Sequence, residues 1–123
     1  METRSTARYV PISFRKVKLV LDTIRGEGVE RALEILRLNR GRAARLVEKV
    51  VHAAVAAAAE LHDVEAEGLV VCRAWVDVGP LRKGRLTRAR GSWTPILHRS
   101  SHIHIVVSDE TGEAAPEPEA PAT

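Results

Sequence analysis

Apolar residues recur at the spacing of one helical face in three stretches of the first half of the chain. The first predicted helix follows Ser13, which stands where an N-cap belongs, and ends at Gly26 and Gly28. A second helix is predicted from about Val29 to Leu38, and Asn39 is expected to cap a third. The predicted buried faces are Val17, Val20, Leu21 and Ile24 in the first helix, Val29, Ala32, Leu33 and Leu36 in the second, and Ala43, Leu46, Val47, Val50, Ala54, Ala57, Ala58 and Leu61 in the third.

Three other stretches have the composition and alternation of strands. A short first strand is predicted within Ala7 to Ile12, with Pro11 at its end or at an edge position. Leu69 to Val78 and His102 to Val107 are expected to pair with each other. In the former, the alternation places four residues on one face: Val70, Cys72, Ala74 and Val76. The predicted fold class is α+β, a small three-stranded antiparallel sheet packed on three helices with a long protruding β-hairpin.

The stretch between these two strands, residues 79–102, differs from the rest of the chain. It contains no Asp or Glu, and its cations are Arg82, Lys83, Arg85, Arg88, Arg90 and Arg99. We expect it to form an extended basic hairpin, because it cannot bury a core of its own. If Val71 faces Val107 and Asp77 faces Ser101, the turn centres near Ala89, and each side of the arm has about 12 residues, or roughly 40 Å.

The charge is unevenly distributed along the chain. The net charge is +3, but five of the 16 acidic residues lie in the tail, so residues 1–108 carry 19 basic and 11 acidic residues, a net of +8. We interpret 1–108 as a single domain that includes the hairpin 79–102, and 109–123 as an acidic disordered tail. Charge alone points to nucleic acid or an anionic membrane surface. Because no apolar run approaches membrane-spanning length and no signal core is present, a soluble cytosolic protein without a membrane partner is expected.

Residue types that support catalysis or metal binding occur near the base of the predicted hairpin. Those that could meet there are Asp77, Ser100, Ser101, His102 and His104. An enzyme is not expected, because the chain has no nucleophile elbow and no glycine-rich phosphate loop. His98, His102 and His104 lack a cysteine or a suitably placed carboxylate to complete a tetrahedral metal site, and the single cysteine, Cys72, fits a small buried hydrophobe. No cofactor, metal or small-molecule substrate is expected.

The cations suggest a different chemistry. Besides those of the arm, a second group lies near the first strand and first helix: Arg8, Arg15, Lys16, Lys18 and Arg25. Arginine pairs with phosphate oxygens through two parallel hydrogen bonds, and phosphate contacts supply most of the affinity for nucleic acid. An extended basic ribbon suits threading between the helices of a folded RNA. The alternative is a basic β-arm architectural protein that wraps DNA.

Six short strings occur in a characteristic order and spacing: ARYV at 7–10, RKVKLVLDTIRG at 15–26, LVEKV at 46–50, VDVGP at 76–80, RARG at 88–91 and SHIHIVV at 101–107. In these the chain resembles the bacterial large-subunit ribosomal protein twenty-two family, from Ala7 to Ser108. The resemblance implies a structural, non-enzymatic constituent of the large subunit in the cytoplasmic ribosome, which binds its rRNA and neighbouring ribosomal proteins and supports assembly. It also implies that the hairpin lines the nascent-peptide exit tunnel. The tip facing the nascent polypeptide would comprise Arg88, Ala89, Arg90 and Gly91.

Charge and resemblance together define the expected rRNA-binding residues. They are Arg8, Ser13, Arg15, Lys16, Lys18, Arg25, Arg82, Lys83, Arg85, Arg88, Arg90, Arg99 and His102. Phe14 replaces the proline usual at the family's helix start, and residues 92–98, SWTPILH, replace a basic run on the returning side of the arm. Trp93 is therefore an atypical arm contact, expected to stack on a base or pack against a neighbouring protein. The altered arm also leaves open an off-ribosome RNA-binding paralogue.

Overall fold

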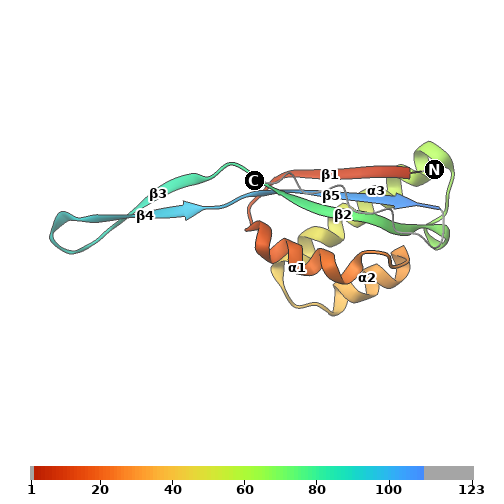
Figure 1. The fold of residues 1–123 in the computed structure, drawn as a ribbon, viewed down its shortest axis with the longest axis horizontal. Helices are drawn as coiled ribbons and strands as arrows, with labels where there is room; N and C mark the ends of the chain where they lie inside the picture. The colour runs from red at the N-terminus through yellow and green to blue at the C-terminus, as the bar shows by residue number, and fades with distance from the viewer. Residues whose placement is uncertain (1, 110–123) are drawn as a thin grey trace.

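The computed structural model describes residues 2–109, which form a helix-and-sheet body with one long arm (Figure 1). In chain order the elements are β1 (Glu2–Val10), α1 (Phe14–Ile24), α2 (Val29–Leu38), α3 (Arg42–His62), the 3-10 turn η1 (Ala66–Gly68), β2 (Val70–Val78), β3 (Arg82–Thr87), the 3-10 turn η2 (Ala89–Gly91), β4 (Trp93–His98) and β5 (Ser101–Ser108). This architecture confirms the predicted fold class. The acidic tail beyond residue 109 lies outside the described residues.

The body's sheet has the antiparallel order β1-β5-β2, so β5 is the central strand. Ile103, Ile105 and Val107 of β5 are fully buried in the core, as their alternation predicts. The first strand is longer than predicted, because it begins at Glu2, which pairs with Ser108. Its polar first half shows little apolar alternation, and it is held as a strand by its ladder with β5.

A β-bulge in β2 changes which side chains face the helices. Val71 pairs with Val107 and Arg73 with Val106, so Cys72 is the extra residue. The alternation of faces shifts at a bulge. Leu69 and Val71 therefore join Ala74 in the core, with Val76 packed against it, and the prediction that Val70 and Cys72 share the face of Ala74 is wrong. The Cys72 thiol instead donates a hydrogen bond of 3.3 Å to the Val106 carbonyl.

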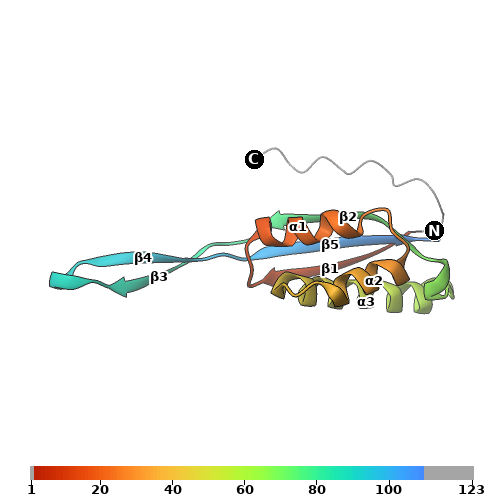
Figure 2. The same cartoon turned by 90° about the horizontal axis from the view of Figure 1, so that it is seen from below.

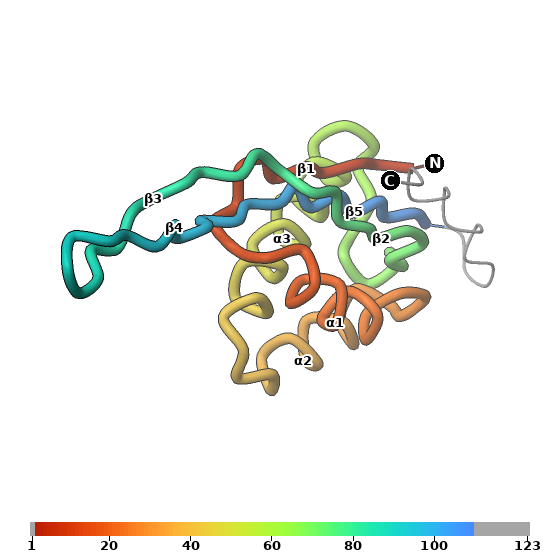
Figure 3. Tube along the Cα trace, turned by 60° about the vertical axis from the view of Figure 1, so that its left-hand side comes forward, coloured from red at the N-terminus to blue at the C-terminus, as the bar shows by residue number. Residues whose placement is uncertain are grey.

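The three helices cover one face of the sheet (Figures 2 and 3). α3 packs against β1 and β5, α1 packs against β2, and α2 packs against both other helices. Fully buried Ala44, Ala54 and Ala58 keep the face of α3 small enough to lie close to its neighbours. The buried faces predicted for α1 and α2 are confirmed, with Leu33 partly buried. Leu61, predicted to be buried in α3, is 70% exposed in its last turn.

The arm is a separate two-stranded ribbon of β3 and β4 that projects beyond the helices (Figure 1). Its pairing runs from Arg82 opposite His98 to Thr87 opposite Trp93, which centres the turn on Arg90 rather than Ala89. The register differs because the bulge at Cys72 moves the partner of Asp77 from Ser101 to His102, and the chain shifts once more before β3. Arg90 and Gly91 turn the chain with left-handed backbones, at φ 60° and 75°.

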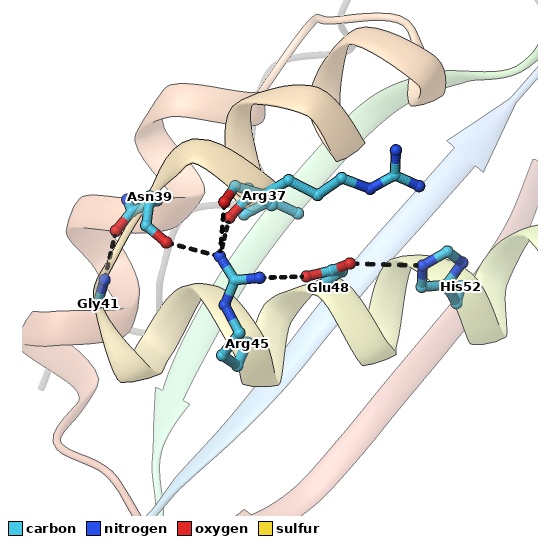
Figure 4. Close-up of polar contacts among 7 residues, drawn as sticks. Arg37, Asn39, Gly41, Arg45, Glu48 and His52 are labelled. Atoms are coloured by element: carbon cyan, nitrogen blue, oxygen red, sulfur yellow. Dashed lines mark hydrogen bonds and ion pairs between the residues drawn. The ribbon is translucent and has the colours of Figure 1, made fainter.

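Arg45 of α3 closes the junction between α2 and α3 (Figure 4). Its Nη2 donates hydrogen bonds to the carbonyls of Leu36, Arg37 (3.1 Å) and Asn39 (2.6 Å) at the end of α2. These carbonyls would otherwise lack partners, because the last turn of a helix leaves them unpaired. Asn39 was predicted to be the N-cap of the third helix. Gly41 is the N-cap instead, and the Asn39 side chain accepts a hydrogen bond from the Gly41 N–H.

Replacing Arg45 by Met should lower the free energy of unfolding by about 1–2 kcal/mol, because it keeps the aliphatic stem but removes the donors to the α2 carbonyls. Urea denaturation followed by circular dichroism measures the change. The matched control is Arg31→Met, whose lost ion pair with Glu34 is exposed and should cost less than about 0.5 kcal/mol. Equal losses in the two variants would show that Arg45 does not act as a cap.

Candidate nucleic-acid interface

A cleft of about 750 Å³ lies where the arm joins the body. Four cations from different parts of the chain line it: Lys16 of α1, Arg42 at the start of α3, Arg82 of β3 and Arg99 between β4 and β5. Among the described residues, no Asp or Glu lines this cleft. The arrangement concentrates positive charge on a concave surface, which attracts anionic groups more strongly than scattered surface cations do.

Two helices begin at this cleft. Ser13 and Gly41, the N-cap residues of α1 and α3, both line it, and neither helix has a side-chain cap hydrogen bond or an acidic residue in its first turn. The first N–H groups of a helix have no partner within the helix, and the helix dipole places partial positive charge there. The two helix starts therefore add to the attraction that the cations exert on phosphate.

Arg15 and Arg99 form a second, smaller hollow beside the first, with Ser13 and Phe14. The Arg15 guanidinium carbon lies 6.0 Å from the centre of the Phe14 ring. Phe14 begins α1 although it replaces the proline that the resemblance leads one to expect. The replacement thus preserves the helix and adds an aromatic neighbour to one of its cations.

The other predicted cations of the body do not all face the cleft. Arg8 of β1 and Lys18 of α1 are exposed and lie outside its lining. Arg25 is half-buried and pairs with Asp22, and its Nε donates a hydrogen bond of 2.8 Å to the Ala74 carbonyl. In this conformation Arg25 ties α1 to β2. Sequence reasoning assigned it to RNA, because nothing in the local sequence reveals the strand that it contacts.

On the arm, the predicted cations from Arg82 to Arg90 are all exposed, and Arg88 also donates a hydrogen bond of 3.2 Å to Thr94 Oγ1. His102 lies at the arm's base, where its Nδ1 accepts a hydrogen bond of 3.1 Å from the Tyr9 N–H. Its ring also meets the Tyr9 ring edge-on at 5.1 Å. The arm therefore presents its charge to solvent, whereas His102 also helps to hold β1 against β5.

Two cations that the sequence reading did not single out become prominent in the structure. Arg42 faces the cleft while its Nη1 donates a hydrogen bond of 3.1 Å to the Pro11 carbonyl, so it links α3 to the end of β1. Arg4 lies on the sheet face opposite the helices, 5.3 Å from the centre of the Trp75 ring. In the sequence, the only feature that could have pointed to Arg42 as a cleft residue is its position directly after a glycine at the start of a helix. No signal pointed to Arg4, because the first half of β1 was not predicted.

His104 is the buried polar centre of that open sheet face. Its Nδ1 accepts a hydrogen bond from Arg4 Nη2 (2.8 Å) and lies 3.1 Å from Thr6 Oγ1, and its ring stacks on Trp75 at 4.9 Å. The proton of the neutral ring is then on Nε2, which lies 2.9 Å from Asp77 Oδ2. Burial lowers the pKa of His104. The Asp77 carboxylate opposes this shift, and Arg4 adds to it.

The pattern of the sequence matches a known family over most of its length. The model of the family described as ribosomal protein L22p/L17e matches residues 5–108. The chain belongs to the L22p/L17e family. It is 45% identical over 113 residues to the large ribosomal subunit protein uL22 of Thermus thermophilus, a match that covers 92% of this chain and all of that protein. It is also 44% identical over 110 residues to uL22 of Desulforamulus reducens, covering 89% and 97% of the two chains.

Membership of the L22p/L17e family identifies a ribosomal protein rather than an enzyme. Within residues 2–109, no group of three or more His, Cys, Asp or Glu residues is placed to hold a metal ion. The helices of this part of the chain also lack the length and apolar character needed to cross a membrane. Burial, as the largest cause, raises the pKa of the Cys72 thiol, consistent with a packed rather than a reactive cysteine.

The His104 contacts predict a loss of stability in mild acid. In the folded protein the pKa of His104 lies below its ordinary value of 6.5, so as the pH falls the unfolded chain binds the proton before the folded chain does. The free energy of unfolding should therefore fall as the pH drops through about 6.5 towards the folded pKa. His104→Gln should flatten the profile between about pH 7 and 5, as measured by urea denaturation. His62→Gln, at an exposed position, is the control. An unchanged profile in His104→Gln would refute the assignment.

Proposed function

We propose that this L22p/L17e protein is a structural constituent of the large ribosomal subunit that binds large-subunit rRNA and supports subunit assembly in the cytoplasm. The observation that carries the proposal is the cleft at the arm's base, where Lys16, Arg42, Arg82 and Arg99 meet two helix N-termini without a lining carboxylate. The relatives named as large ribosomal subunit proteins, matched over nearly their whole length, support the same conclusion.

The mechanism is electrostatic and mechanical. Phosphate groups of one RNA segment occupy the cleft, and the exposed cations of the arm bind further segments along its length. Because β3 and β4 form an isolated ribbon without a core, the arm gains much of its order from the RNA around it. Neighbouring ribosomal proteins are further partners. The chain thereby connects RNA segments that are separated by the length of the arm.

The cleft's contribution can be tested with the double variant Lys16→Gln and Arg82→Gln. It should weaken binding to transcribed large-subunit rRNA and reduce the slope of log affinity against log salt by roughly 1–2, since each lost phosphate contact removes about 0.7–0.9. Filter binding at several salt concentrations measures both. The matched control is Arg31→Gln with Arg37→Gln on α2, away from the cleft.

Co-sedimentation of the same tagged variants with large subunits through a salt-washed gradient extends this test to assembly. The cleft variant should be depleted from the subunit fraction, and the α2 variant should remain there. Equal incorporation of both, with equal salt slopes, would mean that the cleft does not anchor RNA.

The tip of the arm, Arg88 to Gly91, is proposed to line the nascent-peptide exit tunnel and to face the nascent polypeptide. Its support is the resemblance of RARG to the family's tip, together with a turn centred on Arg90 at the far end of the arm. The left-handed backbones of Arg90 and Gly91 keep this turn tight, so the tip occupies little width in a confined channel.

A photo-crosslinking residue in place of Ala89 should label nascent chains in translating ribosomes, because the tip would lie within reach of the polypeptide. The same residue in place of Leu61, which is 70% exposed in the last turn of α3 and lies outside the cleft and the arm, is the control and should give no such product. Gel analysis of radiolabelled nascent chains detects the adduct. Labelling of RNA alone from position 89 would place the tip outside the tunnel lumen.

A further inference from the structure

The register of the arm divides its side chains into two faces. Residues directly opposite each other in an antiparallel ladder point to the same side, and successive pairs alternate. One face, here called the Trp93 face, consists of the pairs Lys83 with Leu97, Arg85 with Pro95 and Thr87 with Trp93. The other, the Ile96 face, consists of Arg82 with His98, Gly84 with Ile96 and Leu86 with Thr94. Charge and aromatic character thus combine on one side of the ribbon.

The Trp93 ring is open to an incoming partner. Trp93 is 56% exposed, and the Arg85 guanidinium carbon lies 4.9 Å from the centre of its ring. Trp75 is different, because it is half-buried, stacks on His104 and lies beside Arg4 within the body. Within residues 2–109, Arg85 is the one ring or cation partner of Trp93. The remaining surface of the indole is free to stack.

We propose that the Trp93 face binds an unpaired RNA nucleotide, whose base stacks on Trp93 while neighbouring phosphates pair with Lys83 and Arg85. The inference rests on the proposed function and names a nucleotide-binding site within it. Base stacking on aromatic side chains next to a basic track is the usual physical basis for holding single-stranded RNA.

The spacing and charge of this face favour RNA over a polypeptide. Lys83 and Arg85 are two residues apart on one strand, so their Cα atoms lie about 7 Å from each other and point the same way. The face carries no carboxylate, and the exposed Leu97 and Pro95 extend the apolar floor beside the ring. RNA can pair its phosphates with Lys83 and Arg85 and stack a base on the indole of Trp93. An uncharged peptide segment would contact only the apolar side chains of this face.

The test uses the full chain and two probes, an oligoadenylate of about 12 nucleotides and an abasic oligomer of equal length, which keeps the phosphates but lacks the bases. Trp93→Ala should weaken oligoadenylate binding roughly 5- to 150-fold, the range for one lost base stack, and leave abasic binding unchanged. Trp93→Phe should retain most of the affinity. The matched control is Leu86→Ala on the Ile96 face, 42% exposed, which should change neither.

A second measurement observes the ring directly. In a Trp75→Phe background, in which Trp93 is the remaining tryptophan, oligoadenylate should quench the fluorescence and the abasic oligomer should not. Quenching by an unstructured peptide at lower concentration than by oligoadenylate would assign the face to a polypeptide and overturn the inference.

Three binding results would also overturn it: no binding of oligoadenylate by the wild type, equal effects of Trp93→Ala on both probes, or an equal loss in Leu86→Ala. The proposed function fails separately, if the wild-type chain does not bind transcribed large-subunit rRNA. If the wild-type chain binds rRNA and Trp93→Ala does not change oligoadenylate binding, only the proposed nucleotide site is rejected.

Discussion

The antiparallel pairing of β5 with a strand on each side is the constraint on which the rest of the structure depends. β5 buries Ile103, Ile105 and Val107 against the helices and forms hydrogen-bonded ladders with both β1 and β2. The arm is continuous with this strand through residues 99 and 100. Because an isolated two-stranded ribbon is only marginally stable in water, its base has to be anchored in a sheet that has a core. The body supplies that anchorage.

The same pairing brings the charges together. β1 ends and α1 begins beside the point where the arm leaves the body, and the α2–α3 junction places the start of α3 at the same corner. Like charges gathered in this way repel one another, so the arrangement costs free energy until an anion arrives. Arg45 donates hydrogen bonds to backbone carbonyls at this junction, and Arg42 contacts the Pro11 carbonyl and lines the cleft.

Much of the fold could be predicted from periodicity. The bounds of α2 were predicted correctly, and the alternation of β5 marked its buried face, because a repeat of 3.6 or 2 is a local property. The structure departs from the predictions where contacts between residues distant in the sequence determine the local structure. The bulge at Cys72 moved the register by one residue, the polar first half of β1 became a strand through its ladder with β5, and Leu61 in the last turn of α3 is exposed to solvent.

By itself, the sequence determined the fold class, the basic arm and the family resemblance, because these depend on residue types and spacings that neighbouring positions show directly. The tertiary structure alone decided which cations lie together. It brought Lys16, Arg42, Arg82 and Arg99 into one cleft, turned Arg25 onto the Ala74 carbonyl, and placed Trp93 on the face of Lys83 and Arg85. The physical reason is that electrostatic and stacking interactions depend on the distance between groups in space, whatever their separation along the chain.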